Sequence, residues 1–141
     1  MTSTAKGPGV ADRLGIGQGM VVREFGFDED VDMELRAAVE QAAGSGLVDD
    51  DHEGLADVAL LWFREDDGDI VDALVDTLGP LSDGGTIWLL TPKTGRDGYV
   101  EPGDIAEAVV TAGLAKTTSI SVAPDWAGTR LATARNPKNR S

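Results

Sequence analysis

The sequence predicts a three-layer α/β sandwich with a mainly parallel sheet, and three features of its pattern indicate this. Apolar runs and amphipathic stretches alternate over residues 57–113, in the order Val58–Phe63, Ile70–Leu81, Thr86–Leu90 and Asp104–Ala112. Each apolar run follows the last by about thirty residues, which is the spacing of a right-handed crossover between parallel strands. After Gly113 the pattern changes to alternation of apolar and polar residues, which is typical of an antiparallel hairpin.

The first strand and helix are predicted on either side of an acidic loop. The strand, Met20–Phe27, is rich in Val and Phe and follows three glycines between residues 15 and 19, which we interpret as a flexible entry turn. Apolar residues then recur at helical spacing, namely Val31, Leu35, Ala38, Val39 and Ala42. Gly44 and Gly46 follow this stripe and can end the helix.

The second strand and helix have the clearest pattern in the chain. Asp57–Phe63 is a strand with an unbroken apolar run after its first residue, as expected of a central strand that is covered on both faces. The next helix carries one apolar stripe and ends near Leu81, because Gly79 and Pro80 stop it. Ser82–Gly85 is predicted to be a tight turn into the third strand, Thr86–Thr91.

The last third of the chain is predicted to contain one helix and a hairpin. Pro92–Gly98 is a polar loop, and Pro102 suits the first turn of the helix that follows. In the hairpin, Thr118–Val122 alternates between two faces, and a turn over Ala123–Gly128 leads to Thr129–Thr133.

Size and composition predict one domain in the cytoplasm. The chain has 141 residues, which we divide into a disordered tail 1–10, a single α/β domain 11–134 and a disordered basic tail 135–141. No apolar stretch approaches the roughly twenty residues that cross a bilayer, and the start has no apolar block typical of a secretory signal. The absence of cysteine excludes disulfides and thiol chemistry, and the single histidine, His52, has no serine motif beside it. We therefore predict no catalytic residue.

Charge is the second strong signal, because 25 acidic residues against 12 basic ones give a net charge of −13. Between Asp28 and Asp76 there are seventeen acids and two bases, Arg36 and Arg64. Such a surface repels nucleic acid and anionic membranes, whereas it steers a basic protein partner towards itself. The alternative is that the acids only keep a small protein soluble.

The sequence predicts neither a cofactor nor a metal. The three early glycines precede a strand, whereas a dinucleotide-binding loop follows a strand and opens a helix. At the matching position only Gly26 remains, and the acids at 28–30 discourage an anionic ligand while they complement the helix dipole. A calcium loop starting at Asp28 fails, because Met33 and Val39 replace its required Gly and Glu. Weak magnesium binding across the two acidic clusters, Asp28–Glu34 and Glu65–Asp69, is left as an alternative.

One resemblance concerns the fold. The order of LGIGQGMVVREFGF, ALVDTLGPLSDGGTIWLL and DIAEAVVTAGL, with a final hairpin, resembles class I S-adenosylmethionine-dependent methyltransferases. It implies a Rossmann-like, methyltransferase-like three-layer sandwich with a short parallel sheet and a C-terminal antiparallel hairpin. The chain departs from that family at Phe27–Asp30, where the family has a Gly-rich turn. It also has no room before Asp57 for the two strands that carry the ribose-binding acid, so the resemblance implies the fold without its cofactor site.

The second resemblance covers nearly the whole chain. VVREFGFDEDVDMELRAAVEQA, LLWFREDDGDIVDALVDTL and GTIWLLTPKTGRDGYVEPGDIAEA resemble the segments of an uncharacterised family of small acidic actinobacterial proteins, a domain of unknown function. This likeness implies no established activity or cofactor.

Two hypotheses of function follow. The first is a non-enzymatic protein-interaction or regulatory domain on a degenerate methyltransferase-like scaffold, with an unknown, basic protein partner. Its predicted surface consists of Asp28, Glu29, Asp30, Asp32, Glu65, Asp66, Asp67 and Asp69. The alternative is a binder of a nucleotide or S-adenosylmethionine-like ligand, or a weak enzyme, at the edge where the parallel strands end. Its predicted residues, with Arg64 and Lys93 holding an anion, are Phe27, Asp28, Arg64, Glu65, Thr91, Lys93 and Thr94.

Overall fold

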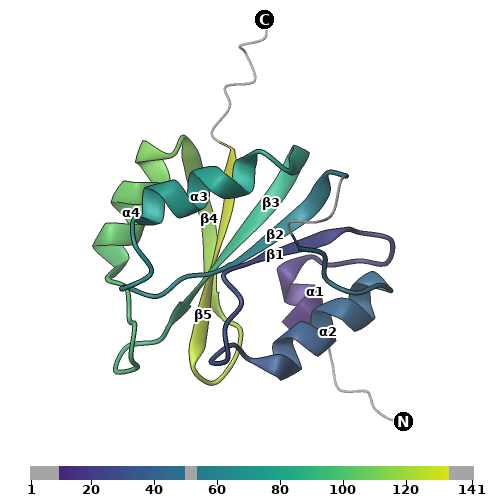
Figure 1. Cartoon of the computed structure of the whole chain (residues 1–141), viewed down its shortest axis with the longest axis horizontal. Coiled ribbons are helices and arrows are strands. Elements are labelled where there is room, and N and C mark those ends of the chain that lie inside the picture. Colours follow the sequence, from purple (N-terminus) through teal and green to yellow (C-terminus); the bar gives the residue numbers. More distant parts are fainter. Residues whose placement is uncertain (1–9, 50–53, 134–141) are drawn as a thin grey trace, which may run out of the picture.

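The computed structural model describes residues 10–49 and 54–133, which form one five-stranded sheet between two helical layers (Figure 1). The predicted tails, 1–10 and 135–141, lie outside the described residues except for Val10, and so does the loop residue His52. In chain order the elements are α1 (Val10–Leu14), β1 (Val22–Phe25), α2 (Met33–Ala43), β2 (Ala56–Trp62), α3 (Ile70–Leu78), β3 (Leu81–Pro92), α4 (Pro102–Thr111), β4 (Leu114–Ser121) and β5 (Trp126–Thr133).

The sheet has the order β1-β2-β3-β5-β4. The pairs β1–β2 and β2–β3 are parallel, while β3–β5 and β5–β4 are antiparallel. This confirms the predicted α/β sandwich, with a short parallel sheet extended by a C-terminal antiparallel hairpin. The second strand of that hairpin lies inside the sheet, next to β3, so β4 forms one edge and β1 the other.

Each face of the sheet packs against its own pair of helices. On one face, α1 and α2 cover a core that includes Leu60, Trp62 and Trp88. On the other, α3 and α4 cover a core that includes Ile87 and Leu89. Since side chains alternate along a strand, β2 supplies both cores, which is why its residues after Asp57 are all apolar. All three tryptophans are buried.

The differences from the predicted elements are local. The helix α1 was not predicted; it is held to the sheet by a hydrogen bond from Trp88 Nε1 to the carbonyl oxygen of Leu14 at 2.9 Å. The predicted turn at Ser82–Gly85 is a bulge within β3, because Leu81 pairs with Ala56 and Thr86 already pairs with Val58. A second irregularity lies in β4, between Lys116 and Thr118.

The described part of the connection between α2 and β2 contains no helix or strand. In its described part, Val48 forms a single parallel bridge to Arg23 on the outer side of β1. The sheet therefore ends at β1, as expected from the short spacing before Asp57. None of the helices described is both long enough and apolar enough to cross a bilayer.

Candidate functional site

The carboxyl ends of β1 and β2 meet at Arg64, whose residue is 7% exposed. Its Nη1 donates to the carbonyl oxygens of Gly26 at 2.8 Å and Trp62 at 3.3 Å. Gly26 has a φ of +77°, and a Cβ at this position would lie 2.3 Å from the Trp62 carbonyl oxygen. The chain therefore needs glycine here, since no other side chain permits this approach of the two backbones.

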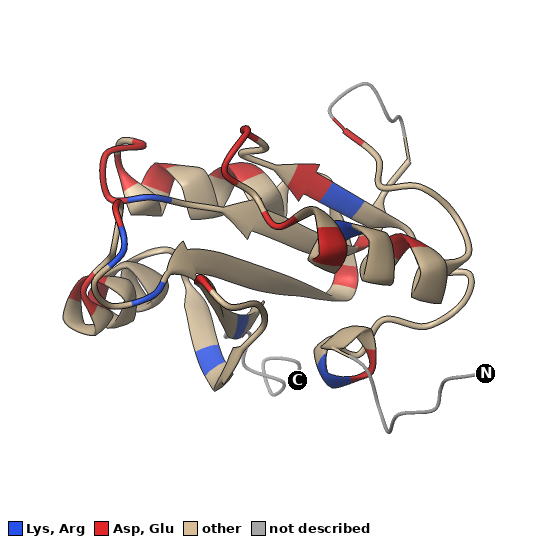
Figure 2. Cartoon of the chain, turned by 90° about the horizontal axis from the view of Figure 1, so that it is seen from below, with Lys and Arg blue, Asp and Glu red and all other residues tan. Residues whose placement is uncertain are grey.

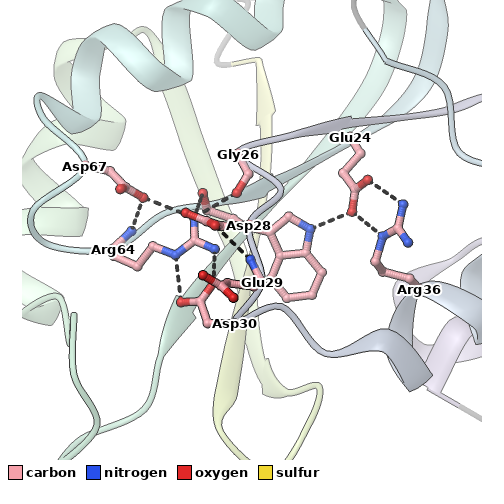
Figure 3. Close-up of polar contacts among 9 residues, drawn as sticks. Glu24, Gly26, Asp28, Glu29, Asp30, Arg36, Arg64 and Asp67 are labelled. Atoms are coloured by element: carbon pink, nitrogen blue, oxygen red, sulfur yellow. Dashed lines mark hydrogen bonds and ion pairs between the residues drawn. The ribbon is translucent and has the colours of Figure 1, made fainter.

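The same guanidinium joins the acidic loops that follow the two strands (Figure 3). Its Nε donates to Asp30 Oδ2 at 3.0 Å, its Nη2 donates to Asp30 Oδ1, and its Nη1 lies 3.2 Å from Asp67 Oδ2. The guanidinium also lies over the ring of Trp126, 5.3 Å from its centre. Arg64 thus fastens the loop after β1 and the loop after β2 to the sheet.

The pairing shifts the pKa of both partners. The hydrogen bond from Arg64 lowers the pKa of Asp30 below its ordinary value of 3.8, and outweighs the partial burial that raises it. Burial lowers the pKa of Arg64, but the hydrogen bonds and charges of Asp30 and Asp67 together more than offset this, so its pKa is raised. Arg64 therefore stays charged, with its charge directed at these carboxylates.

A second, partly buried ion pair lies beside the first. Arg36 donates to both carboxylate oxygens of Glu24, at 2.7 and 2.8 Å, and Trp62 Nε1 donates to the same carboxylate at 2.9 Å (Figure 3). This hydrogen bonding to Glu24 raises the pKa of Arg36. The guanidinium also lies 4.7 Å from the ring centre of Phe27. The helix α2 is thereby tied to β1 and β2.

Several of the predicted surface acids have structural partners. Asp32 caps α2 by accepting from the Leu35 N–H, and Asp69 caps α3 by accepting from the N–H groups of Val71 and Asp72. Asp28 accepts from the N–H of Glu29 at 2.8 Å. With Asp30 and Asp67 held by Arg64, five of the eight predicted acids stabilise the loops themselves.

Three acids of the two loops remain exposed, with carboxylates that make no hydrogen bond or ion pair to any described residue: Glu29, Glu65 and Asp66. Figure 2 shows acidic residues gathered on the loops that follow β1 and β2. Two exposed apolar side chains lie on the first of these loops and at the start of α2, Phe27 at 54% and Met33 at 58% exposed. The structure therefore brings both predicted acidic clusters, with an aromatic ring beside them, to one end of the sheet.

The residues predicted for a small-ligand site do not share one cavity. Phe27, Asp28 and Arg64 line a cavity of about 280 Å³ between the ends of β1 and β2. Glu65 lines a cavity of about 430 Å³ between α3 and α4. The remaining three, Thr91, Lys93 and Thr94, line a third cavity of about 470 Å³ after β3. Arg64 and Lys93 are therefore not brought together around one anion.

A second basic residue of the third cavity, Lys116, was not identified from the sequence. Lys116, on β4, lines the same cavity as Lys93. Its position in an alternating strand gives no motif, and only the scarcity of lysine in this chain, which has four, marks it out. No group of three or more His, Asp or Glu side chains suited to hold a metal occurs among the residues described.

Solved structures with a similar fold include several methyltransferases. The CcbJ methyltransferase from Streptomyces caelestis superposes with a TM-score of 0.57 at 12% identity, over 89% of this chain and 94% of that one. An S-adenosylmethionine dependent methyltransferase from Mesorhizobium loti gives a TM-score of 0.55 at 12% identity, over 86% of this chain and 94% of the other. At such identities the likeness shows the fold alone.

Similarity in sequence is far higher to two mycobacterial proteins. Uncharacterized protein Rv2239c of Mycobacterium tuberculosis and uncharacterized protein Mb2263c of Mycobacterium bovis are each 47% identical over 131 residues, covering 93% of this chain and 80% of theirs. A family model described as "Protein of unknown function (DUF3052)" matches residues 11–135. This match covers most of the chain, which therefore belongs to the family of proteins of unknown function DUF3052.

Proposed function

We propose that this protein is a non-enzymatic docking domain of the cytoplasm, which binds a basic segment of another protein at the acidic end of its sheet. The observation that carries the proposal is the Arg64 network, because it holds both acidic loops in one fixed arrangement before any partner arrives. A surface that is already ordered loses less conformational entropy on binding.

The composition of this surface supports a protein partner. Phe27 gives it an exposed aromatic ring, and Met33 adds a flexible apolar side chain. Around them, the free carboxylates of Glu29, Glu65 and Asp66 can pair with lysine or arginine. Aromatic residues at the centre and charges at the rim are typical of protein interfaces, where complementary charge also speeds association.

The same residues do not fit S-adenosylmethionine, the cofactor of the structurally similar methyltransferase from Mesorhizobium loti. The carbonyl oxygens of Gly26 and Trp62, at the crevice between β1 and β2, are taken by Arg64. The cavity that remains there carries the carboxylates of Asp28 and Asp67 on its wall. Helix N-terminal amides that would bind an anionic group are capped by Asp32. We therefore assign no methyl-transfer step.

A defined peptide tests the docking proposal. The probe is a labelled helical peptide with arginine on one face and leucine on the other, and its binding is measured by fluorescence anisotropy at low and high salt. We expect saturable binding that weakens with salt. The variant Phe27→Ala leaves the net charge unchanged and should weaken binding about tenfold, because it removes the apolar anchor.

Two triple variants separate a specific surface from general attraction to an acidic protein. Glu29→Gln/Glu65→Gln/Asp66→Asn removes three charges from the proposed surface without touching Arg64. Asp12→Asn/Asp76→Asn/Asp83→Asn removes three exposed charges elsewhere. We expect the first set to weaken binding markedly more than the second. Equal effects of the two sets, or full affinity in Phe27→Ala, would overturn the proposal.

A further inference from the structure

The cavity after β3 has a different character from the rest of this acidic protein. Its floor is the sheet face formed by β3, β4 and β5, and its walls are the loop after β3 and the start of α4. Its thirteen lining residues include no Asp or Glu, although the chain has 25 acids in 141 residues. At about 470 Å³ it lies in the size range of small-molecule sites.

Both lysines of the described residues line this cavity, Lys93 from the loop and Lys116 from β4. Lys93 donates through its ammonium to the hydroxyl of Ser121, and neither lysine forms an ion pair with a described carboxylate. The cavity between α3 and α4 shows the opposite pattern, with acids on its wall and no base. Two of the eight basic residues that the structure describes thus line a cavity that a small molecule can enter.

Two threonine hydroxyls line the cavity without a hydrogen bond to a described residue. Thr91 is 4% exposed and Thr129 is 6% exposed, and both line the cavity from neighbouring strands. Neither hydroxyl forms a hydrogen bond to another residue in the part of the chain that the structure describes. Ser119, the β4 partner of Thr129, adds a third hydroxyl to the same wall. These hydroxyls are therefore available to donate hydrogen bonds to a bound acceptor.

The start of α4 adds to the positive electrostatic potential of this cavity. This helix begins at Pro102 beside the cavity, and Glu101 makes no side-chain hydrogen bond to its first turn. Uncapped amides at a helix N-terminus carry a partial positive charge. The cavity also has an apolar wall, formed by Val100, Ile105 and Ala106.

We propose that this cavity binds a small organic phosphate, with the phosphate facing Lys93, Lys116 and the hydroxyls, and an apolar body against α4. Ammonium groups bind phosphate as point charges, and hydroxyl donors complete its hydrogen bonds. This site lies on the α4 face of the sheet and is independent of the docking surface, since the two share no residue.

The test uses 1-naphthyl phosphate as the probe, followed by the amide resonances of the full-length protein in two-dimensional NMR. We expect saturable shifts at Thr91, Lys116, Ser119 and Thr129. Inorganic phosphate, which lacks the apolar body, and 1-naphthol, which lacks the charge, should each bind more weakly. The substitution Lys116→Gln should weaken the affinity for 1-naphthyl phosphate about fivefold or more, because it removes a charge-assisted hydrogen bond.

Arg130→Gln is the matched control. Arg130 is an exposed base on β5, beside Thr129, but its side chain lines a cavity on the opposite face of the sheet. Loss of its charge should leave the affinity unchanged, and Thr129→Val should weaken binding without a change in charge. Equal losses in Lys116→Gln and Arg130→Gln, equal affinity for 1-naphthol, or shifts confined to other parts of the protein would each overturn the proposal. The spectra themselves report whether every variant is folded.

Discussion

At the scale of single residues, Asp30 has the most direct consequence for stability. Because Arg64 lowers its pKa in the folded protein, ionised Asp30 stabilises the fold at pH values above its ordinary 3.8. This contribution is lost as the pH falls through the lowered folded-state pKa. We expect Asp30→Asn to be less stable than the native protein near neutral pH, and the difference to shrink below about pH 4. Urea denaturation of both proteins at a series of pH values measures this difference in the free energy of unfolding.

Asp66→Asn is the control for this measurement. Asp66 is on the same acidic loop as Asp67 but makes no hydrogen bond or ion pair with a described residue. Its neutralisation should change the free energy of unfolding little at any pH. If the difference in the free energy of unfolding between native protein and Asp30→Asn grew as the pH fell, the assigned role of Asp30 would be wrong.

Residue roles were predictable only where the local pattern fixes them. An acidic start to α2 was expected from the residues at 28–30, and the residue that caps this helix is Asp32. Arg64 and Lys93 were both placed at the strand ends from their positions after apolar runs. In the structure their side chains make separate contacts. Gly26 lets the backbone after β1 approach Arg64, whereas Lys93 donates to Ser121 of β4. Such contacts between distant segments leave no local signal.

At the scale of elements, Arg64 links the ends of β1 and β2 to both loops. We expect Arg64→Met to destabilise the protein by about 2–3 kcal/mol, since it leaves buried carbonyl oxygens and two carboxylates without their donor. Urea denaturation followed by tryptophan fluorescence measures this, because Trp62 and Trp126 are buried beside the network.

Arg96→Met provides the comparison at an exposed ion pair. Arg96 pairs with Asp125 at 2.8 Å, and both side chains are more than half exposed. Exposed pairs contribute about 0–1 kcal/mol, so this variant should retain nearly full stability. Equal losses in the two variants would show that Arg64 acts as a surface charge.

Elements with a long apolar pattern were predicted well. The strand β2 and the helices α3 and α4 lie where the runs and stripes indicated, because burial on a sheet imposes the period of the pattern. The helix α1 was not foreseen, since its five residues are too few to show a period. Trp126 and Gly128 belong to β5 although the sequence favoured a turn, because pairing with β3 outweighs local preference.

At the scale of the whole molecule, the net charge of −13 acts against the compact state. Most of this charge is on exposed side chains, so salt should screen the repulsion. We expect added sodium chloride to raise the thermal midpoint at pH 7 by about 4 °C for each kcal/mol of repulsion removed. At pH 4.2, near the isoelectric point, the same salt should have a much smaller effect. A midpoint that falls with salt at pH 7 would show that pairs such as Arg64 with Asp30 dominate the electrostatics.

The bulge in β4 also affects the tendency of this protein to aggregate. A strand at the rim of a sheet offers unpaired backbone groups to any other strand, and this is how many proteins begin to aggregate. Here β4 is interrupted between Lys116 and Thr118, and it carries a charged side chain at the interruption. On the opposite rim, Val48 already occupies part of β1. Both rims thus oppose the addition of a foreign strand, so the protein can keep an open sheet without forming fibres.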